Sequence, residues 1–244
     1  MKKLIYCATA LVAALFAASC QREMHEPVAE GGVTYTITLP EAVQTKGNSG
    51  YDDYSLHYEV YKTIDAAELP TASLLFEKSV DFTGNTAKVS LDLLNDQDYT
   101  VLFWANKKGV TDTYFDLTDL RNVQLNTGSL NANDNDRDAF CGMDQIDNHD
   151  GSVSKTVKLT RPFAQVNIGT IVPTVAEIGY DVTPQESYVK ISGVPVAYNV
   201  LQGKAVAGTS NVEFKQSAIP TDKKIGTDYT LVAMNYVLVP ESNI

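Results

Sequence analysis

Three aspartates in one polar stretch have a spacing that could bind a metal ion. Asp134, Asp136 and Asp138 alternate along the chain, and alternating carboxylates can supply the oxygen ligands that Ca²⁺ prefers. However, the stretch lacks the glycine and the terminal glutamate of an EF-hand loop, and Arg137 adds a positive charge to it. A solvated acidic loop explains the pattern more simply. We therefore treat the three aspartates as weak calcium candidates and predict no metal and no cofactor.

The histidines are scattered and form no catalytic set with other residues. His25, His57 and His149 lie far apart in the sequence, and His57 has the spacing of a solvated residue on a strand. The chain has no His-x-x-x-His, Gly-x-Ser-x-Gly, phosphate-binding glycine loop or dinucleotide fingerprint. We predict that the protein is not an enzyme.

The N-terminal segment has the features of an export signal. Lys2 and Lys3 precede an apolar run of about a dozen residues, which is too short to span a bilayer comfortably. Small residues then lead directly to Cys20, an arrangement that resembles a bacterial lipobox. We predict a signal peptide over residues 1–19 and lipidation of Cys20 by acyl chains such as palmitate. The alternative is an ordinary cleavage site followed by an incidental cysteine.

The charge and the cysteine content limit which partners and which disulfide bonds are expected for the mature protein. The formal net charge is −11 and no long run of Lys or Arg occurs, so we predict no nucleic-acid partner. Once residues 1–19 are removed, Cys20 and Cys141 are the remaining cysteines. With Cys20 lipidated, Cys141 would have no disulfide partner, and we expect it to be a small buried side chain. Residues 20–32 are polar and contain Pro and Gly, as in a flexible tether.

The body of the chain has the pattern of many short strands. Val33, Tyr35, Ile37 and Leu39 alternate with threonines, which predicts a strand with one buried face. Further strands are predicted along the chain, and the only helical signal is a single turn near Thr174–Glu177. The sequence therefore predicts an all-β fold, either an antiparallel sandwich or a barrel.

Two more detailed predictions concern the middle of the chain. The runs 87–93 and 99–105 are separated by a polar turn, so we expect a hairpin whose second strand is buried on both faces. Residues 126–152 are rich in Gly, Asn and Asp, which predicts a long exposed loop. This loop would divide the body into an N-terminal domain over 33–159 and a C-terminal domain over 160–244.

Lys46 lies just after the first predicted strand, within a segment of Gly, Ser and Asn residues. Exposed segments of this composition are preferred sites of proteolysis. Lys46 is thus a candidate cleavage site, although on this evidence alone an ordinary surface lysine is the simpler interpretation.

Taken together, these segments resemble a known family. A lipobox leader, a first strand at Val33–Leu39 and a basic residue in the following loop resemble the fimbrillins of Bacteroidetes, the subunits of type V pili. Similar segments continue through most of the mature chain: Tyr99–Ala105, Asp119–Arg121, Ala139–Gly142, Leu159–Ile168 and Asn235–Pro240.

The resemblance implies two transthyretin-like antiparallel β-sandwich domains and export as a lipoprotein to the surface of the outer membrane. It also implies that a processing protease cuts after the first strand, at Lys46. The lipidated first strand, with Val33, Tyr35, Ile37 and Leu39, would then leave. A strand from another fimbrial subunit would replace it, giving a fimbria that serves cell adhesion.

Two features depart from the family pattern. The family is commonly cut after Arg, whereas Lys46 stands at the matching place here. The sequence ends at Ile244, soon after a predicted strand, so the second domain is either incomplete or shortened. A different class of function also stays open, namely a monomeric surface lipoprotein that binds glycan or another ligand through exposed tyrosines. A secreted enzyme is the third and weakest interpretation.

Overall fold

The computed structural model describes most of the chain after residue 30. The described residues are 31–40, 51–63, 69–94, 96–128, 130–148, 152–170, 186–206, 208–216, 224–226 and 229–239. The predicted signal peptide, Cys20, Lys46 and the helical turn at Thr174–Glu177 lie outside them. Among the described residues, no helix has the length and apolar character needed to cross a membrane.

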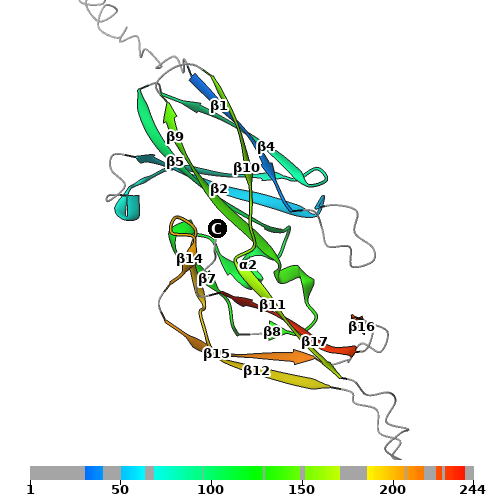
Figure 1. Ribbon diagram of the computed structural model, residues 1–244. Helices are drawn as coiled ribbons and strands as arrows, with labels where there is room; N and C mark the ends of the chain where they lie inside the picture. Colours follow the sequence, from blue (N-terminus) through cyan, green and yellow to red (C-terminus); the bar gives the residue numbers. More distant parts are fainter. Residues whose placement is uncertain are drawn as a thin grey trace, which may run out of the picture.

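Two sheets face each other in the upper part of Figure 1. One has three strands in the order β10-β1-β4, and the other has four in the order β3-β2-β5-β9. Their apolar faces meet in one large core to which both sheets contribute. The strands are β1 (Gly31–Thr38), β2 (Tyr54–Thr63), β3 (Leu74–Asp81), β4 (Thr86–Leu93), β5 (Gln97–Lys107), β9 (Ala139–Asn148) and β10 (Val153–Lys158).

Three smaller sheets make up the lower part of Figure 1, in the orders β11-β17-β16, β12-β15-β8 and β14-β13-β7-β6. Their strands are β6 (Phe115–Asp116), β7 (Val123–Leu125), β8 (Leu130–Asn131), β11 (Phe163–Thr170), β12 (Ser187–Val194), β13 (Ala197–Asn199), β14 (Lys204–Ala205), β15 (Ser210–Gln216), β16 (Lys224–Ile225) and β17 (Tyr229–Leu238). Helical turns are short: η1 (Leu69–Thr71), α2 (Thr111–Tyr114), η2 (Leu120–Asn122) and η3 (Asn135–Arg137). The predicted all-β sandwich class is confirmed.

Strand β5 contributes to two cores. Successive side chains of a strand point to opposite faces, and in β5 both faces are apolar. Val101 and Phe103 pack into the core between the first two sheets. Leu102 and Trp104 pack on the other face, with aromatic residues such as Phe115. The prediction that this strand is buried on both faces is confirmed.

The predicted hairpin over 87–93 and 99–105 is wrong. Strand β4 pairs with β1, whereas β5 pairs with β2 and β9, so the polar turn carries the chain from one sheet to the other. An alternating pattern shows which face of a strand is buried. It does not show which strand lies beside it, because both sheets bury their apolar faces in the same core.

The predicted long loop over 126–152 is also wrong, because β9 lies within it. This ten-residue strand forms the edge of the larger sheet and pairs with β5 along its whole length. Its first residues, Ala139, Phe140 and Cys141, are buried, and farther along the exposed Gln145 and Asp147 lie on either side of the buried Ile146. Strand β8 also lies within this stretch and pairs with β15, while β7, just before it, pairs with β13; both partners lie beyond residue 186. The domain boundary at residues 159 and 160 stays a prediction.

Candidate functional site: the first strand and its two neighbours

Strand β1 is the central strand of its sheet although it is the first described segment of the chain. It runs antiparallel to β4, with Val33 opposite Leu91, and parallel to β10, with Val33 beside Val153. Its backbone is therefore paired on both sides. At its end, the Leu39 N–H donates to the Asn85 carbonyl at 3.0 Å and the Leu159 N–H donates to the Thr38 carbonyl at 2.9 Å.

The four apolar side chains of the first strand lie where their alternation predicts. Val33, Tyr35 and Ile37 are fully buried and Leu39 is 2% exposed. All four belong to the core between the two facing sheets. The Tyr35 ring packs edge-on against Phe103 of β5, with ring centroids 5.3 Å apart. The strand thus supplies part of the core as well as part of the sheet.

A polar contact also connects β1 to the opposite sheet. The Tyr35 hydroxyl donates a hydrogen bond of 2.8 Å to Oδ2 of Asp144 in β9. The same carboxylate oxygen accepts a bond of 2.6 Å from Nζ of Lys155 in β10. Burial, together with the neighbouring Asp144 carboxylate, raises the pKa of Tyr35 above its usual range. The hydroxyl therefore stays protonated and keeps its donor role at physiological pH.

The order of segments makes β1 detachable in topological terms. No described segment precedes it, and the next described segment after Leu39 and Pro40 begins at Tyr51. The intervening residues, which include Lys46, lie outside the described residues. A cut there would leave β1 joined to the rest of the protein by noncovalent contacts alone. If β1 withdrew, β4 and β10 would each expose a row of unpaired backbone groups, which is a template for another strand.

The three weak calcium candidates each contact donors of the protein itself. Asp134 accepts hydrogen bonds from the Asp136 N–H and from the Tyr114 hydroxyl. Asp136 pairs with Lys107 at 2.5 Å. Asp138 is held by Arg161 through bonds of 2.8 to 3.0 Å. In the part of the chain that the structure describes, these carboxylates do not form a shared set of oxygen ligands.

The predictions for Cys141 and His57 compare differently with the structure. Cys141 is buried, as expected, and it is a free cysteine among the residues that the structure describes. His57, in contrast, is not a simply solvated residue: its side chain is 18% exposed, and it lies near Glu59 and Glu77. The sequence analysis missed this group, although the alternation of His57 and Glu59 on one strand places both on the same face.

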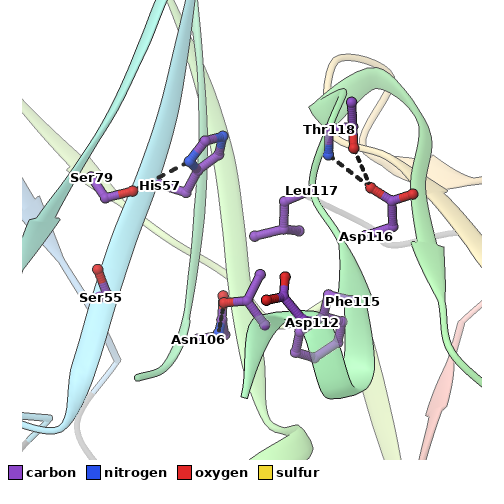
Figure 2. Close-up of a pocket in the computed structure, with 10 residues that line it drawn as sticks. Ser55, His57, Ser79, Asn106, Asp112, Phe115, Asp116, Leu117 and Thr118 are labelled. Carbon is purple, nitrogen blue, oxygen red and sulfur yellow. Dashed lines mark hydrogen bonds between the residues drawn. The ribbon is translucent and has the colours of Figure 1, made fainter. Parts of the chain in front are cut away.

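His57 also borders a pocket between the larger sheet and the segment that follows β5 (Figure 2). The pocket has a volume of about 490 Å³. Ser55, His57 and Ser79 line it on the sheet side, and Asp112 and Asp116 are among the residues on the other side.

Solved structures with a similar fold come from Bacteroidetes. A protein of Bacteroides thetaiotaomicron proposed to bind polysaccharide (DUF1812) is 12% identical, with a TM-score of 0.53, over 85% of this chain and 72% of that chain. A proposed adhesin of Bacteroides ovatus is 16% identical, with a TM-score of 0.53, over 87% and 70%. The fimbrial anchor protein Mfa2 of Porphyromonas gingivalis is 13% identical, with a TM-score of 0.51, over 87% and 74%.

These likenesses confirm the predicted resemblance to Bacteroidetes fimbrial proteins at the level of the fold. The sequence has no match among curated proteins. A family model described as a family of unknown function, DUF6562, matches residues 25–243, which is most of the chain. The chain therefore belongs to the DUF6562 family.

Proposed function

We propose that the protein is a subunit of a cell-surface fimbria that serves adhesion and is assembled by strand exchange. In this proposal, lipid on Cys20 holds the protein at the outer membrane until a processing protease cuts after Lys46. The observation that carries the proposal is the position of β1, an N-terminal strand that is also the central strand of its sheet. The fold shared with a fimbrial anchor protein and a proposed adhesin supports a fimbrial or adhesive role over an enzymatic one.

The energetics favour replacement of β1 over a permanent vacancy. Its four buried apolar side chains contribute roughly 6–12 kcal/mol by removal from water, before the cost of ordering a new strand. A strand from a neighbouring subunit would recover both this burial and the backbone hydrogen bonds. Since such donation is head-to-tail and does not close on itself, it would build a filament.

Cleavage is tested first with a lysine variant. A trypsin-like protease should make one early cut in the native protein, and Lys46→Gln should abolish this cut. Lys88→Gln is a matched control, because Lys88 is an exposed lysine that lies within β4. If the native chain is cut at many sites at once, or if Lys46→Gln is cut as fast as the parent, the proposed processing is wrong.

Strand release is tested by tethering β1 to its neighbour. Thr34 and Ser90 are exposed partners in the antiparallel register of β1 and β4, a geometry that a disulfide can span. We expect the Thr34→Cys, Ser90→Cys protein to stay monomeric after cleavage and to form multimers once reduced. The control is Lys190→Cys with Glu213→Cys, a cross-strand pair between β12 and β15. Equal multimer formation with and without reductant would contradict strand release.

A second candidate function, glycan binding, is favoured by one exposed tyrosine. Tyr188 in β12 is 66% exposed, and Nζ of Lys215 lies 5.7 Å from its ring centroid. Both residues line a pocket of about 440 Å³ together with Asn131, Asn211 and Glu213. An aromatic ring beside amide and carboxylate groups has the chemistry to stack on a sugar and bond its hydroxyls.

The glycan candidate is tested on an array of surface and dietary polysaccharides. Tyr188→Ala should remove any binding signal, whereas Tyr229→Ala should retain it, because Tyr229 is exposed on a different strand. A signal that survives Tyr188→Ala would exclude this surface as the binding site.

A further inference from the structure

Three possible metal ligands meet on the face of β2 and β3 that points away from the first core. His57 and Glu59 are two residues apart on β2 and so share a face. On β3, Ser79 lies opposite His57 and Glu77 lies opposite Glu59. One imidazole nitrogen and one oxygen from each of the two carboxylates all lie within 4.8 Å of one another.

The hydrogen bonds within this group do not balance its negative charge, and Arg121, which stacks on the Tyr61 ring, acts on Glu59 through space. Glu59 is fully buried, and its hydrogen-bond donors are neutral: the Tyr61 hydroxyl at 2.6 Å and the Leu120 N–H at 3.0 and 3.1 Å. Glu77 is a second carboxylate directly across the ladder, and like charges at such positions are destabilising. A cation between them would remove this repulsion.

The His57 ring is placed between the carboxylates but bonds to neither. Its Nε2 lies 3.9 Å from Glu59 Oε1 and 3.9 Å from Glu77 Oε2, which is too long for a hydrogen bond. Nε2 is buried and has no hydrogen-bond partner. On its other side, Nδ1 lies 3.4 Å from Ser79 Oγ (Figure 2). A proton on Nδ1 directed at Ser79 leaves the lone pair of Nε2 facing the two carboxylates.

We propose that His57, Glu59 and Glu77 bind a divalent transition metal ion of the zinc type. One imidazole and two carboxylates form a ligand set that suits Zn²⁺. Neighbouring groups already orient two of the ligands. Ser79 contacts the His57 ring, and the Leu120 N–H donates a hydrogen bond to Glu59. Metal ligands in proteins typically have such hydrogen-bond partners. The Glu77 side chain is 52% exposed and can move inward to complete the site.

The metal would secure an edge of the larger sheet. Strand β3 is the edge strand beside β2, and most of its residues are exposed, so little core packing holds it in place. A metal bound to Glu77 would cross-link β3 to β2. Through Glu59 and the Leu120 N–H, it would also fix η2 against the sheet. His57 and Ser79 also line the pocket shown in Figure 2.

The test is a Zn²⁺ titration of full-length protein purified in detergent, followed by calorimetry, with Co²⁺ absorption as a report on ligand geometry. We expect one equivalent to bind at this site. His57→Gln and Glu77→Gln should each weaken that binding at least about tenfold. Glu213→Gln is the matched control, an exposed cross-strand glutamate on β15 that makes the same charge change. At a hundredfold excess of Zn²⁺ over the Kd, the thermal midpoint should rise by about 5–10 °C.

Three results would overturn the proposal. The first is no binding of Zn²⁺ or Co²⁺ to the parent protein. The second is equal binding by the parent and both variants, which places the metal elsewhere. The third is displacement of Zn²⁺ by equimolar Mg²⁺ or Ca²⁺, because an imidazole-containing site should not prefer these harder ions.

Discussion

The hydroxyl of Tyr35 reaches across the first core to donate a 2.8 Å hydrogen bond to Asp144 Oδ2. It is a polar contact between the first strand and the edge strand of the facing sheet, and it joins segments 109 residues apart in sequence. Since Lys155 of β10 bonds the same oxygen, three strands meet at one carboxylate. The identity of residue 35 therefore affects how firmly β1 is held.

Tyr35→Phe should loosen β1 without emptying the core. The ring and its contact with Phe103 remain, and Asp144 keeps its bond from Lys155, so we expect a loss of about 1–2 kcal/mol in the free energy of unfolding. Urea denaturation measures this loss. Tyr58→Phe, in the same core but on β2, is the control. If Tyr35→Phe is as stable as the parent, the hydrogen bond does not hold the strand.

Ile37→Ala should be more damaging, because it removes a fully buried side chain from the centre of β1. Large-to-small changes of this kind cost about 2–5 kcal/mol. Thr34→Ala changes an exposed residue of the same strand and should stay within about 0.5 kcal/mol of the parent. Equal midpoints of urea unfolding for the two variants would show that the inward face of β1 adds little to stability.

Arg161→Met should lower the free energy of unfolding, because it leaves a buried carboxylate without its ion-pair partner. The Asp138 side chain is 9% exposed, and Arg161 binds both of its oxygens. Burial raises the pKa of Asp138, and the hydrogen bonds and charge of Arg161 partly offset that rise. Without Arg161, we expect a loss of about 3 kcal/mol at pH 7.

The sign of the pH effect follows from the direction of that shift. A carboxyl group whose pKa is higher in the folded than in the unfolded protein contributes stability at low pH, which is lost as the pH rises through the folded value. The deficit of Arg161→Met should thus shrink as the pH is lowered toward 4. Lys190→Met, at an exposed ion pair with Glu213, should cost at most about 1 kcal/mol. A deficit that does not vary with pH would contradict this account.

Cys141 should be chemically inert in the folded protein. Burial raises the pKa of its thiol to about 12, and a hydrogen bond with Tyr198 offsets part of the effect. At pH 8 the thiolate fraction is then roughly a thousandfold lower than for an exposed cysteine. We expect iodoacetamide to modify Cys141 only after denaturation, as followed by mass spectrometry of its peptide. Rapid native labelling would show that the β9 segment opens.

The sequence was informative where one face of a strand is apolar and the other polar. The alternation at Val33, Tyr35 and Ile37 predicted both the strand and its buried face, and the continuous apolar run 99–105 predicted a strand with two buried faces. Strand β9 was missed because the stretch around it, 126–152, is rich in Gly, Asn and Asp, although Ala139, Phe140 and Cys141 are apolar and buried. Its later half alternates less clearly, and backbone pairing with β5 holds it in the sheet.

How far each candidate site could be predicted depends on whether it is set by local periodicity or by strand pairing. The inward positions of β1 follow from local periodicity. The group of His57, Glu59 and Glu77 depends on the register between β2 and β3, and a single sequence does not specify that register. Similarly, Asp134, Asp136 and Asp138 are close in sequence, but their side chains contact different partners.

The mixed surroundings of β1 have a consequence for filament polarity. Because β4 and β10 run in opposite directions on its two sides, any strand that occupies this position is antiparallel to one neighbour and parallel to the other, whichever way it enters. The backbone hydrogen bonds therefore favour neither direction of the inserted strand strongly. The sizes of the four inward cavities left by Val33, Tyr35, Ile37 and Leu39 must then select the orientation, and with it the direction in which a fibre grows.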